Sequence, residues 1–277
     1  MREDFEVLTV DQLRLKGSLW SQPGLKGTLI WIHGYGEHRL RYAVFAEWLL
    51  KRRIGLAIVD LRGHGDSEGR RGQIQKFEDY LEDLHSLIRY LVHQAGINAV
   101  MIGGHSFGAL VLIRYLQTRT PPSRIRGVVL IAPFLGLPNP IPGWKCKLSR
   151  HCSSVLGFLP LPIDLQIERL SRDRSIVAAY RRDARVLKWT SLRWFAETLK
   201  NQQLAFDRVN EFHTTVIVLL GSEDALVSQA RVRQFYESLP GKKKQYLEFP
   251  GLYHELLFEE QAAQVYEVIR AFLRRLF

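Results

Sequence analysis

The chain has 277 residues, of which 46% are hydrophobic and 24% charged, and its formal net charge is +11 at pH 7. These proportions are typical of a folded globular protein and exclude a disordered chain. The sequence contains no apolar run near the roughly 18 residues that span a bilayer, and its charged start, residues 1–5, is not followed by the apolar core of a secretion peptide.

The positive charge and the two cysteines limit the classes of partner and compartment. No basic helix or aromatic platform accompanies the positive charge, so nucleic-acid binding is not predicted. Cys146 and Cys152 lie six residues apart without a metal-ligand pattern around them, which indicates free thiols in a reducing cytoplasm. We therefore expect a cytoplasmic protein that could associate with a membrane surface only peripherally.

The predicted elements alternate between strands and helices along most of the chain. Apolar, β-branched runs predict strands at residues 5–9, 13–20, 27–33, 54–60, 99–103, 127–132, 215–220 and 245–249. Helical spacing predicts helices at residues 42–53, 77–94, 109–116 and 259–276. The first two strands have the pattern of an edge hairpin. The alternation of the others predicts an α/β fold with a mostly parallel, eight-stranded sheet flanked by helices.

The alternation stops at residues 134–210, where no clear strand is predicted. Because long connections inside a compact domain usually carry function, we interpret this segment as a helical lid inserted before the penultimate strand. The core would then comprise residues 1–133 and 211–277. The lid has apolar residues at helix-like intervals: Trp144, Leu148, Cys152, Val155, Leu156 and Leu159. This stripe would face either a substrate cavity or ordinary packing partners.

The predicted lid also holds much of the positive charge. Between residues 134 and 209 there are thirteen Lys and Arg against six Asp and Glu. A solvated basic face without a partner is the preferred interpretation. The alternative is attraction to anionic lipid head groups, which act on clustered Lys and Arg near a surface.

Residues 104–108, Gly-His-Ser-Phe-Gly, form the most informative motif, a G-x-S-x-G sequence between a predicted strand and a predicted helix. In that context the serine occupies a strained turn, and the flanking glycines remove Cβ atoms that would collide. Its hydroxyl then projects beyond the end of the sheet. Ser106 is therefore our candidate nucleophile, and a plain tight turn is the alternative.

A serine hydroxyl needs a base and an orienting acid to become a nucleophile. For a serine on such a turn, these follow in the order Ser, Asp or Glu, then His, each after a strand. Asp224 follows the strand at 215–220, with Glu223 as the near alternative. His254 follows the strand at 245–249 and is the candidate base, the alternative being an exposed loop histidine.

The oxyanion that forms during acyl transfer needs two backbone N–H donors. Phe107, the residue after the nucleophile, is one candidate, and Tyr35 in the Gly-Tyr-Gly loop after an early strand is the other. His33 precedes the nucleophile in the wrong order for a base, so we interpret it as structural.

A polar turn follows the strand at 54–60. Its residues Asp60, Arg62 and His64 could suggest a metal or acid–base site. A turn held by internal hydrogen bonds is the preferred interpretation, and no metal site is predicted anywhere in the chain.

Several blocks together resemble the monoacylglycerol lipase and lysophospholipase branch of the α/β-hydrolases (serine aminopeptidase S33-like hydrolases). These blocks are residues 33–38, 60–69 and 104–108, with Arg71-Gly72 before residues 77–80, and residues 170–173 followed by Tyr180 and Asp183. The resemblance extends from about residue 5 to 272. It implies the α/β-hydrolase fold, Ser106, Asp224 and His254 as the triad, Tyr35 and Phe107 as oxyanion donors, and a movable lid that lines an acyl tunnel and touches membranes.

The sequence and the resemblance together predict a serine hydrolase that cleaves carboxylic esters of lipids, a monoacylglycerol or a lysophospholipid, through an acyl-enzyme. No metal or organic cofactor is required. The residues assigned to substrate binding are Gly34, His105, Trp144, Leu148 and Leu156. The alternatives are a proline-iminopeptidase-like peptidase, a thioesterase, an acyltransferase and a non-enzymatic binder on this scaffold.

Overall fold

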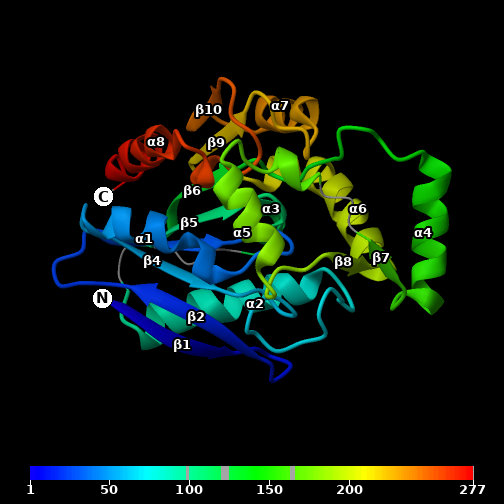
Figure 1. Ribbon diagram of the computed structural model, residues 1–277, viewed down its shortest axis with the longest axis horizontal. Helices are drawn as coiled ribbons and strands as arrows, with labels where there is room; N and C mark the ends of the chain where they lie inside the picture. The colour runs from blue at the N-terminus through cyan, green and yellow to red at the C-terminus, as the bar shows by residue number, and fades with distance from the viewer. Residues whose placement is uncertain (98–99, 120–124, 163–165, 277) are drawn as a thin grey trace.

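The computed structural model describes residues 1–97, 100–119, 125–162 and 166–276. Its main feature is one eight-stranded sheet with the order β1-β2-β4-β3-β5-β6-β9-β10 (Figure 1). The strands are β1 (Arg2–Leu8), β2 (Arg14–Trp20), β3 (Gly27–Ile32), β4 (Ile54–Val59), β5 (Val100–His105), β6 (Ile125–Ile131), β9 (Val216–Gly221) and β10 (Lys244–Phe249). Each of them matches a strand predicted from the sequence.

The direction of the strands confirms the predicted fold class. β1 and β2 form an antiparallel hairpin at one edge, and β2 pairs antiparallel with β4. All the remaining neighbours in the sheet pair in parallel. The carboxyl ends of six strands therefore lie along one edge of the sheet, and the loops that follow them can meet there.

Helices flank the sheet on both faces (Figure 1). The longer ones are α1 (Ala43–Leu50), α2 (Glu78–Arg89), α3 (Phe107–Thr118), α7 (Gln229–Ser238) and α8 (Ala262–Arg274). α2 is continued by a turn of π-helix at Tyr90–Gln94, and short 3₁₀ turns lie at Arg39–Tyr42, Ile167–Arg169, Val209–Glu211 and Leu256–Phe258.

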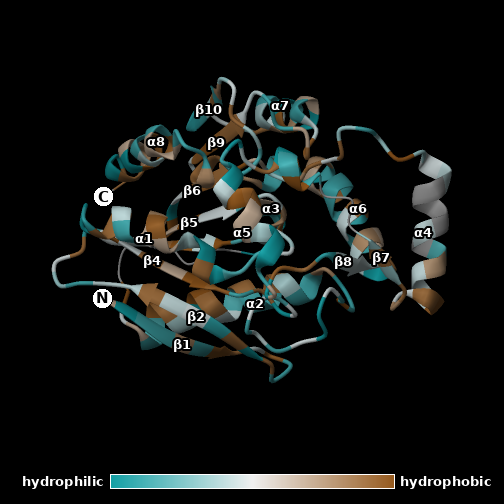
Figure 2. Cartoon of the chain, in the orientation of Figure 1, coloured by the Kyte–Doolittle hydropathy of each residue, from teal (hydrophilic) through white to brown (hydrophobic). Residues whose placement is uncertain are grey.

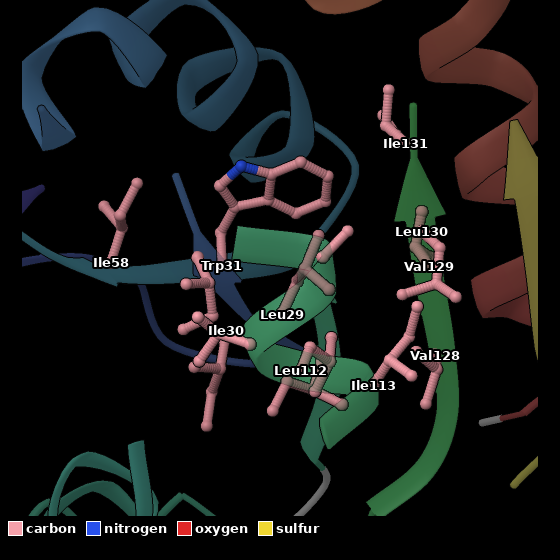
Figure 3. Close-up of a cluster of buried hydrophobic side chains, with 14 of the residues drawn as sticks. Leu29, Ile30, Trp31, Ile58, Leu112, Ile113, Val128, Val129, Leu130 and Ile131 are labelled. Atoms are coloured by element: carbon pink, nitrogen blue, oxygen red, sulfur yellow. The ribbon is translucent and has the colours of Figure 1, made fainter. Parts of the chain in front are cut away.

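The core lies where the central strands meet these helices. Every residue of β3 and of β4 is buried, as expected for parallel strands covered on both faces. Figure 3 shows Trp31 of β3 pointing away from Ile30, so that successive side chains enter opposite layers of the core. Trp31 contacts the ring of Phe45 in α1, with 5.8 Å between the ring centroids. This packing fixes the sheet that positions the loops of the site.

The segment between β6 and β9 holds α4 (Gly143–Leu156), α5 (Arg174–Arg182) and α6 (Leu192–Asp207). It also holds two short antiparallel strands, β7 (Pro160–Pro162) and β8 (Trp189–Ser191), so the expectation that this segment lacks strands is wrong. Three residues are too few for an alternating pattern, and two of those in β7 are prolines, which argue against a strand in any sequence reading. The division into core and lid at residues 133/134 and 210/211 stays a prediction.

α4 lies at the margin of the molecule, apart from the sheet (Figure 1). It contacts α6, where the Arg193 guanidinium donates a hydrogen bond to the carbonyl of Ser153 at 2.7 Å. Among the described residues, none of the helices has both the length and the apolar character required to cross a bilayer.

Candidate active site

Ser106 lies on a sharp turn between β5 and α3. Its backbone adopts φ 53° and ψ −116°, a conformation that L-residues rarely adopt. A Cβ atom on Gly104 would lie 2.8 Å from the carbonyl carbon of Gly108, and a Cβ atom on Gly108 would lie 2.4 Å from the carbonyl oxygen of Ile32. Only glycine fits at both positions, so the motif dictates the turn that presents the serine hydroxyl.

The loops after β9 and β10 bring Asp224 and His254 together. Asp224 Oδ2 accepts a hydrogen bond from Nδ1 of His254 at 2.7 Å, and both side chains are buried. The other carboxylate oxygen of Asp224 accepts the backbone N–H groups of Leu226 at 2.8 Å and Val227 at 3.1 Å. Glu223 is exposed instead, so of the two predicted acids it is Asp224 that contacts the histidine.

The two groups shift each other's pKa in opposite directions, which favours an ionised Asp224 beside a protonated His254. Burial acts to raise the pKa of Asp224, but the charge and hydrogen bond of His254 outweigh it and lower that pKa below 3.8. Burial acts to lower the pKa of His254, but Asp224, with smaller contributions from Glu255 and Glu37, raises it above 6.5. The ring of His254 therefore binds a proton more readily than an isolated imidazole does.

Ser106 and His254 both line a cavity of about 570 Å³, and the backbone positions predicted for the oxyanion hole lie at the same cavity. As the first residue of α3, Phe107 has an N–H group with no acceptor inside the helix. Within the described part of the chain, no backbone acceptor is found for the N–H group of Tyr35. The roles of Tyr35 and Phe107 as oxyanion donors stay predictions.

The cavity wall is mostly apolar. Its apolar residues include Phe134, Leu137, Leu161, Phe195, Leu226 and Val227. Two carboxylates, Glu37 and Glu255, also line the cavity, and no Lys or Arg lines it within the described residues. Such a wall suits an alkyl chain with few charges.

The five residues that we assigned to substrate binding do not all lie at the cavity. His105 lines the cavity. Gly34 is not one of its lining residues and lies against Glu37, where an added Cβ atom would be 2.3 Å from Oε1. Trp144 and Leu156 are 64% and 42% exposed and do not line the cavity, so the expectation that they face it is wrong for this arrangement. The side chain of Leu148 lies outside the described residues.

The error over Trp144 and Leu156 has a physical cause. Helical spacing indicates that apolar side chains share a face, but not which neighbour covers that face. Within the segment between β6 and β9, the residues that line the cavity instead include Tyr180 and Trp194. The sequence marked Tyr180 only through the family resemblance, and Trp194 carried no signal beyond being aromatic.

The polar residues set aside in the sequence are structural. His33 is buried, its Nε2 accepts the N–H of Leu61 at 2.9 Å, and burial lowers its pKa to about 4. Asp60 accepts the N–H of Asp66 at 2.9 Å and forms an ion pair with Arg39. The described residues contain no cluster of His, Cys, Asp and Glu suited to a metal ion.

The other two residues of the polar turn after β4, Arg62 and His64, are also held by hydrogen bonds. Arg62 donates to Asp83 at 2.6 Å and to Asp11 at 2.8 Å, and His64 bonds the carbonyl of Arg62 at 3.0 Å. Cys152 is a free thiol, as predicted, and the side chain of Cys146 lies outside the described residues.

Comparison with known proteins gives consistent similarities. Residues 23–261 match the family described as serine aminopeptidase, S33. The chain is 28% identical over 258 residues to phospholipase YtpA of Bacillus subtilis, covering 91% of this chain and 97% of that protein. It is 29% identical over 241 residues to the monoglyceride lipase of Homo sapiens, covering 86% of this chain and 78% of that one. The crystal structure of Paleococcus ferrophilus monoacylglycerol lipase superimposes with a TM-score of 0.84 at 29% identity, covering 94% of this chain and 98% of that chain.

Proposed function

The chain belongs to the serine aminopeptidase S33 family of α/β-hydrolases, and from that premise we propose that it is a serine hydrolase that cleaves carboxylic esters of lipids. The observation that carries the proposal is the placement of Ser106, on its strained turn, at the same apolar cavity as the His254–Asp224 pair. The similar proteins named phospholipase and monoglyceride lipase support the lipid ester as substrate.

In the proposed reaction, the hydroxyl of Ser106 attacks the ester carbonyl while Nε2 of His254 takes the hydroxyl proton. The backbone N–H groups of Tyr35 and Phe107 bind the oxyanion that forms. The imidazolium then gives its proton to the departing alcohol, and an acyl-enzyme on Ser106 remains. Water, deprotonated by the same imidazole, releases the fatty acid. Asp224 holds Nδ1–H of His254 and stabilises the transient positive charge.

The cavity favours esters over aminoacyl substrates. An aminopeptidase must bind the charged amine of its substrate, which requires a carboxylate that is free to pair with it. Glu37 and Glu255 line the cavity, but Arg41 already forms ion pairs with both, at 3.1 Å and 2.7 Å. The substrate amine would therefore have to displace a buried guanidinium, which disfavours the peptidase alternative.

The lack of a free Lys or Arg favours an uncharged head group. A lysophospholipid would bring a phosphate to a cavity that no Lys or Arg lines among the described residues, and Arg41 is already paired with Glu37 and Glu255. An unpaired ion in such a place costs several kcal/mol, and each 1.4 kcal/mol changes kcat/KM about tenfold. Of the two predicted lipid classes, the monoacylglycerol is thus the better match.

A substrate panel tests this proposal. We expect kcat/KM for a medium- or long-chain monoacylglycerol to exceed that for the lysophosphatidic acid of the same acyl chain by about tenfold or more. The p-nitrophenyl esters of short and long acids serve as controls for acyl length, and aminoacyl amides for peptidase activity. A preference for lysophosphatidic acid would contradict the head-group argument. A preference for acetyl esters or amides would contradict the lipid ester itself.

We further propose that the exposed apolar side chains along the segment around α4 make peripheral contact with an anionic membrane. Trp144 is exposed at the start of α4, and Val155, Leu156, Phe158 and Leu159 are exposed at its end and just beyond it. Figure 2 shows apolar colouring at one end of α4, which stands at the margin of the molecule. The excess of Lys and Arg between residues 134 and 209 would add attraction to anionic head groups.

Vesicle binding tests the membrane contact. We expect the double variant Trp144→Ser, Phe158→Ser to bind vesicles of mixed neutral and anionic lipid about a hundredfold more weakly, because each apolar side chain contributes on the order of 1.5–3 kcal/mol when buried and each 1.4 kcal/mol is about tenfold. Val44→Ser is the matched control, since Val44 is 71% exposed but lies on α1, away from this surface. Equal binding by the double variant and the control, measured by vesicle co-sedimentation, would contradict the proposal.

A further inference from the structure

A second set of hydrogen bonds contacts the backbone of His254, the histidine of the candidate triad. Nδ1 of His105 is 2.7 Å from Oε1 of Glu37, and Nε2 of the same ring is 3.2 Å from the backbone carbonyl oxygen of His254. The centroids of the imidazole rings of His105 and His254 are 4.7 Å apart. His105 is thus the group through which Glu37 contacts the backbone of His254.

Arg41 closes these contacts into a ring. Its two terminal nitrogens donate to the two carboxylate oxygens of Glu255, each at 2.7 Å, and Nη1 also lies 3.1 Å from Oε2 of Glu37. Glu255 is the residue directly after His254 in the chain. The path therefore runs from the His254 carbonyl through His105, Glu37, Arg41 and Glu255, and returns to His254 along the backbone.

All the charged members of this ring are removed from water. Glu37 and Glu255 are 3% and 1% exposed, and the guanidinium of Arg41 lies over the rings of Tyr180 and Phe258 at 4.9 Å and 4.5 Å. Buried ions persist only when their charges are paired and their hydrogen bonds are satisfied. The ion pairs of Arg41 with both carboxylates therefore hold the ring together.

Both carboxylate oxygens of Glu37 are engaged by several partners. Oε1 accepts the N–H of Gly34 at 3.1 Å and Oε2 accepts the hydroxyl of Tyr42 at 2.8 Å, in addition to the contacts with His105 and Arg41. His105 and Arg41 outweigh the effect of burial and hold the pKa of Glu37 well below its usual range. Glu37 is therefore the group that joins His105 to Arg41.

We propose that His105, Glu37, Arg41 and Glu255 form a ring of hydrogen bonds and ion pairs that fixes the backbone of His254, and that Glu255 is a positioning residue for the imidazole. The ring holds His254 from its carbonyl and from its chain neighbour, while Asp224 holds its side chain. The kinetic part of this proposal rests on the proposed function, but the hydrogen bonds of the ring do not.

The kinetic test uses Glu255→Gln, which keeps the shape of the side chain and removes its charge. We expect kcat on a long-chain p-nitrophenyl ester to fall about tenfold or more with KM within about twofold, because the imidazole is less well placed while the apolar wall of the cavity is unchanged. The matched control is Glu260→Gln, an exposed glutamate five residues further on, which is expected to keep wild-type kcat. Rates are divided by the sites titrated with a serine-directed phosphonate, so that unfolded protein does not count. A wild-type kcat for Glu255→Gln would overturn the positioning role.

The hydrogen-bond test needs no catalytic activity and works even if Glu255→Gln does not fold. In ¹H spectra of the wild-type protein labelled with ¹⁵N in its histidine rings, we expect a ring N–H signal of His105 that its hydrogen bond to Glu37 shifts downfield and that burial protects from exchange with water. The signal should be assigned by its loss in His105→Asn, and should move upfield in Glu37→Gln. A His105 ring whose N–H protons exchange as freely as those of an exposed histidine would overturn the ring, even if the protein hydrolyses lipid esters as proposed.

Discussion

Replacement of Ser106 by alanine is expected to lower kcat for ester hydrolysis by about 10³-fold or more while the protein stays folded. The alanine removes the hydroxyl that forms the acyl-enzyme and leaves the oxyanion donors and the cavity in place. It does not add backbone strain, because serine and alanine have similar difficulty with the positive φ of 53° at this position. Initial rates on a long-chain p-nitrophenyl ester measure the effect.

The matched control for this substitution is Ser238→Ala, which removes an exposed hydroxyl at the end of α7, far along the chain from the nucleophile turn. It is expected to retain wild-type kcat. Thermal unfolding of both variants should give Tm values close to that of the wild type. Turnover by a well-folded Ser106→Ala protein at a rate near that of the control would contradict the proposed mechanism.

Asp224→Asn is expected to lower kcat by about 10³- to 10⁴-fold. An asparagine can still accept the N–H groups of Leu226 and Val227, so the loop should keep its shape. It carries no charge to stabilise the imidazolium of His254, and its amide group can favour the wrong tautomer of the ring. The measurement is kcat on the same ester, with KM recorded to separate chemistry from binding.

Glu223→Gln tests the other acid considered in the sequence. It makes the same chemical change one residue away, on an exposed side chain, and is expected to change kcat less than twofold. If Glu223→Gln lost activity and Asp224→Asn did not, the assignment of the acid would be reversed.

Much of the fold could be predicted because its signals are local. β3 and β4 are mostly apolar and buried throughout, since helices cover both of their faces, whereas the edge strand β1 is mostly exposed. The turn at Ser106 was equally predictable, because its two glycines are required by contacts within the strand–turn–helix unit and with β3. In these cases a short stretch of sequence determines its own backbone.

Contacts between distant segments could not be predicted in the same way. Arg41 and Glu255 are 214 residues apart in the chain, and nothing in either neighbourhood indicates that they meet. Glu255 follows the candidate base directly, yet its sequence context is that of an ordinary exposed glutamate. Only the convergence of loops at one edge of the sheet brings the two residues together, and that convergence is a property of the whole fold.

The orientation of α4 illustrates the same limit. Its apolar stripe was predicted correctly as helical, but Trp144 lies on the outer surface rather than in the cavity. Periodicity defines a face of a helix, whereas the partner of that face depends on where the flanking segments place the helix. For this reason the substrate contacts were the least predictable part of the site.

The central claim is that Ser106 becomes acylated, and the most direct measurement is covalent labelling with a long-chain alkyl fluorophosphonate, read by intact mass and peptide mapping. Our account predicts one adduct per chain, located on the peptide that contains Ser106, with loss of ester hydrolysis in proportion to labelling. It also predicts no adduct on Ser106→Ala. Complete labelling of another residue, or full hydrolytic activity in a chain labelled at Ser106, would contradict it.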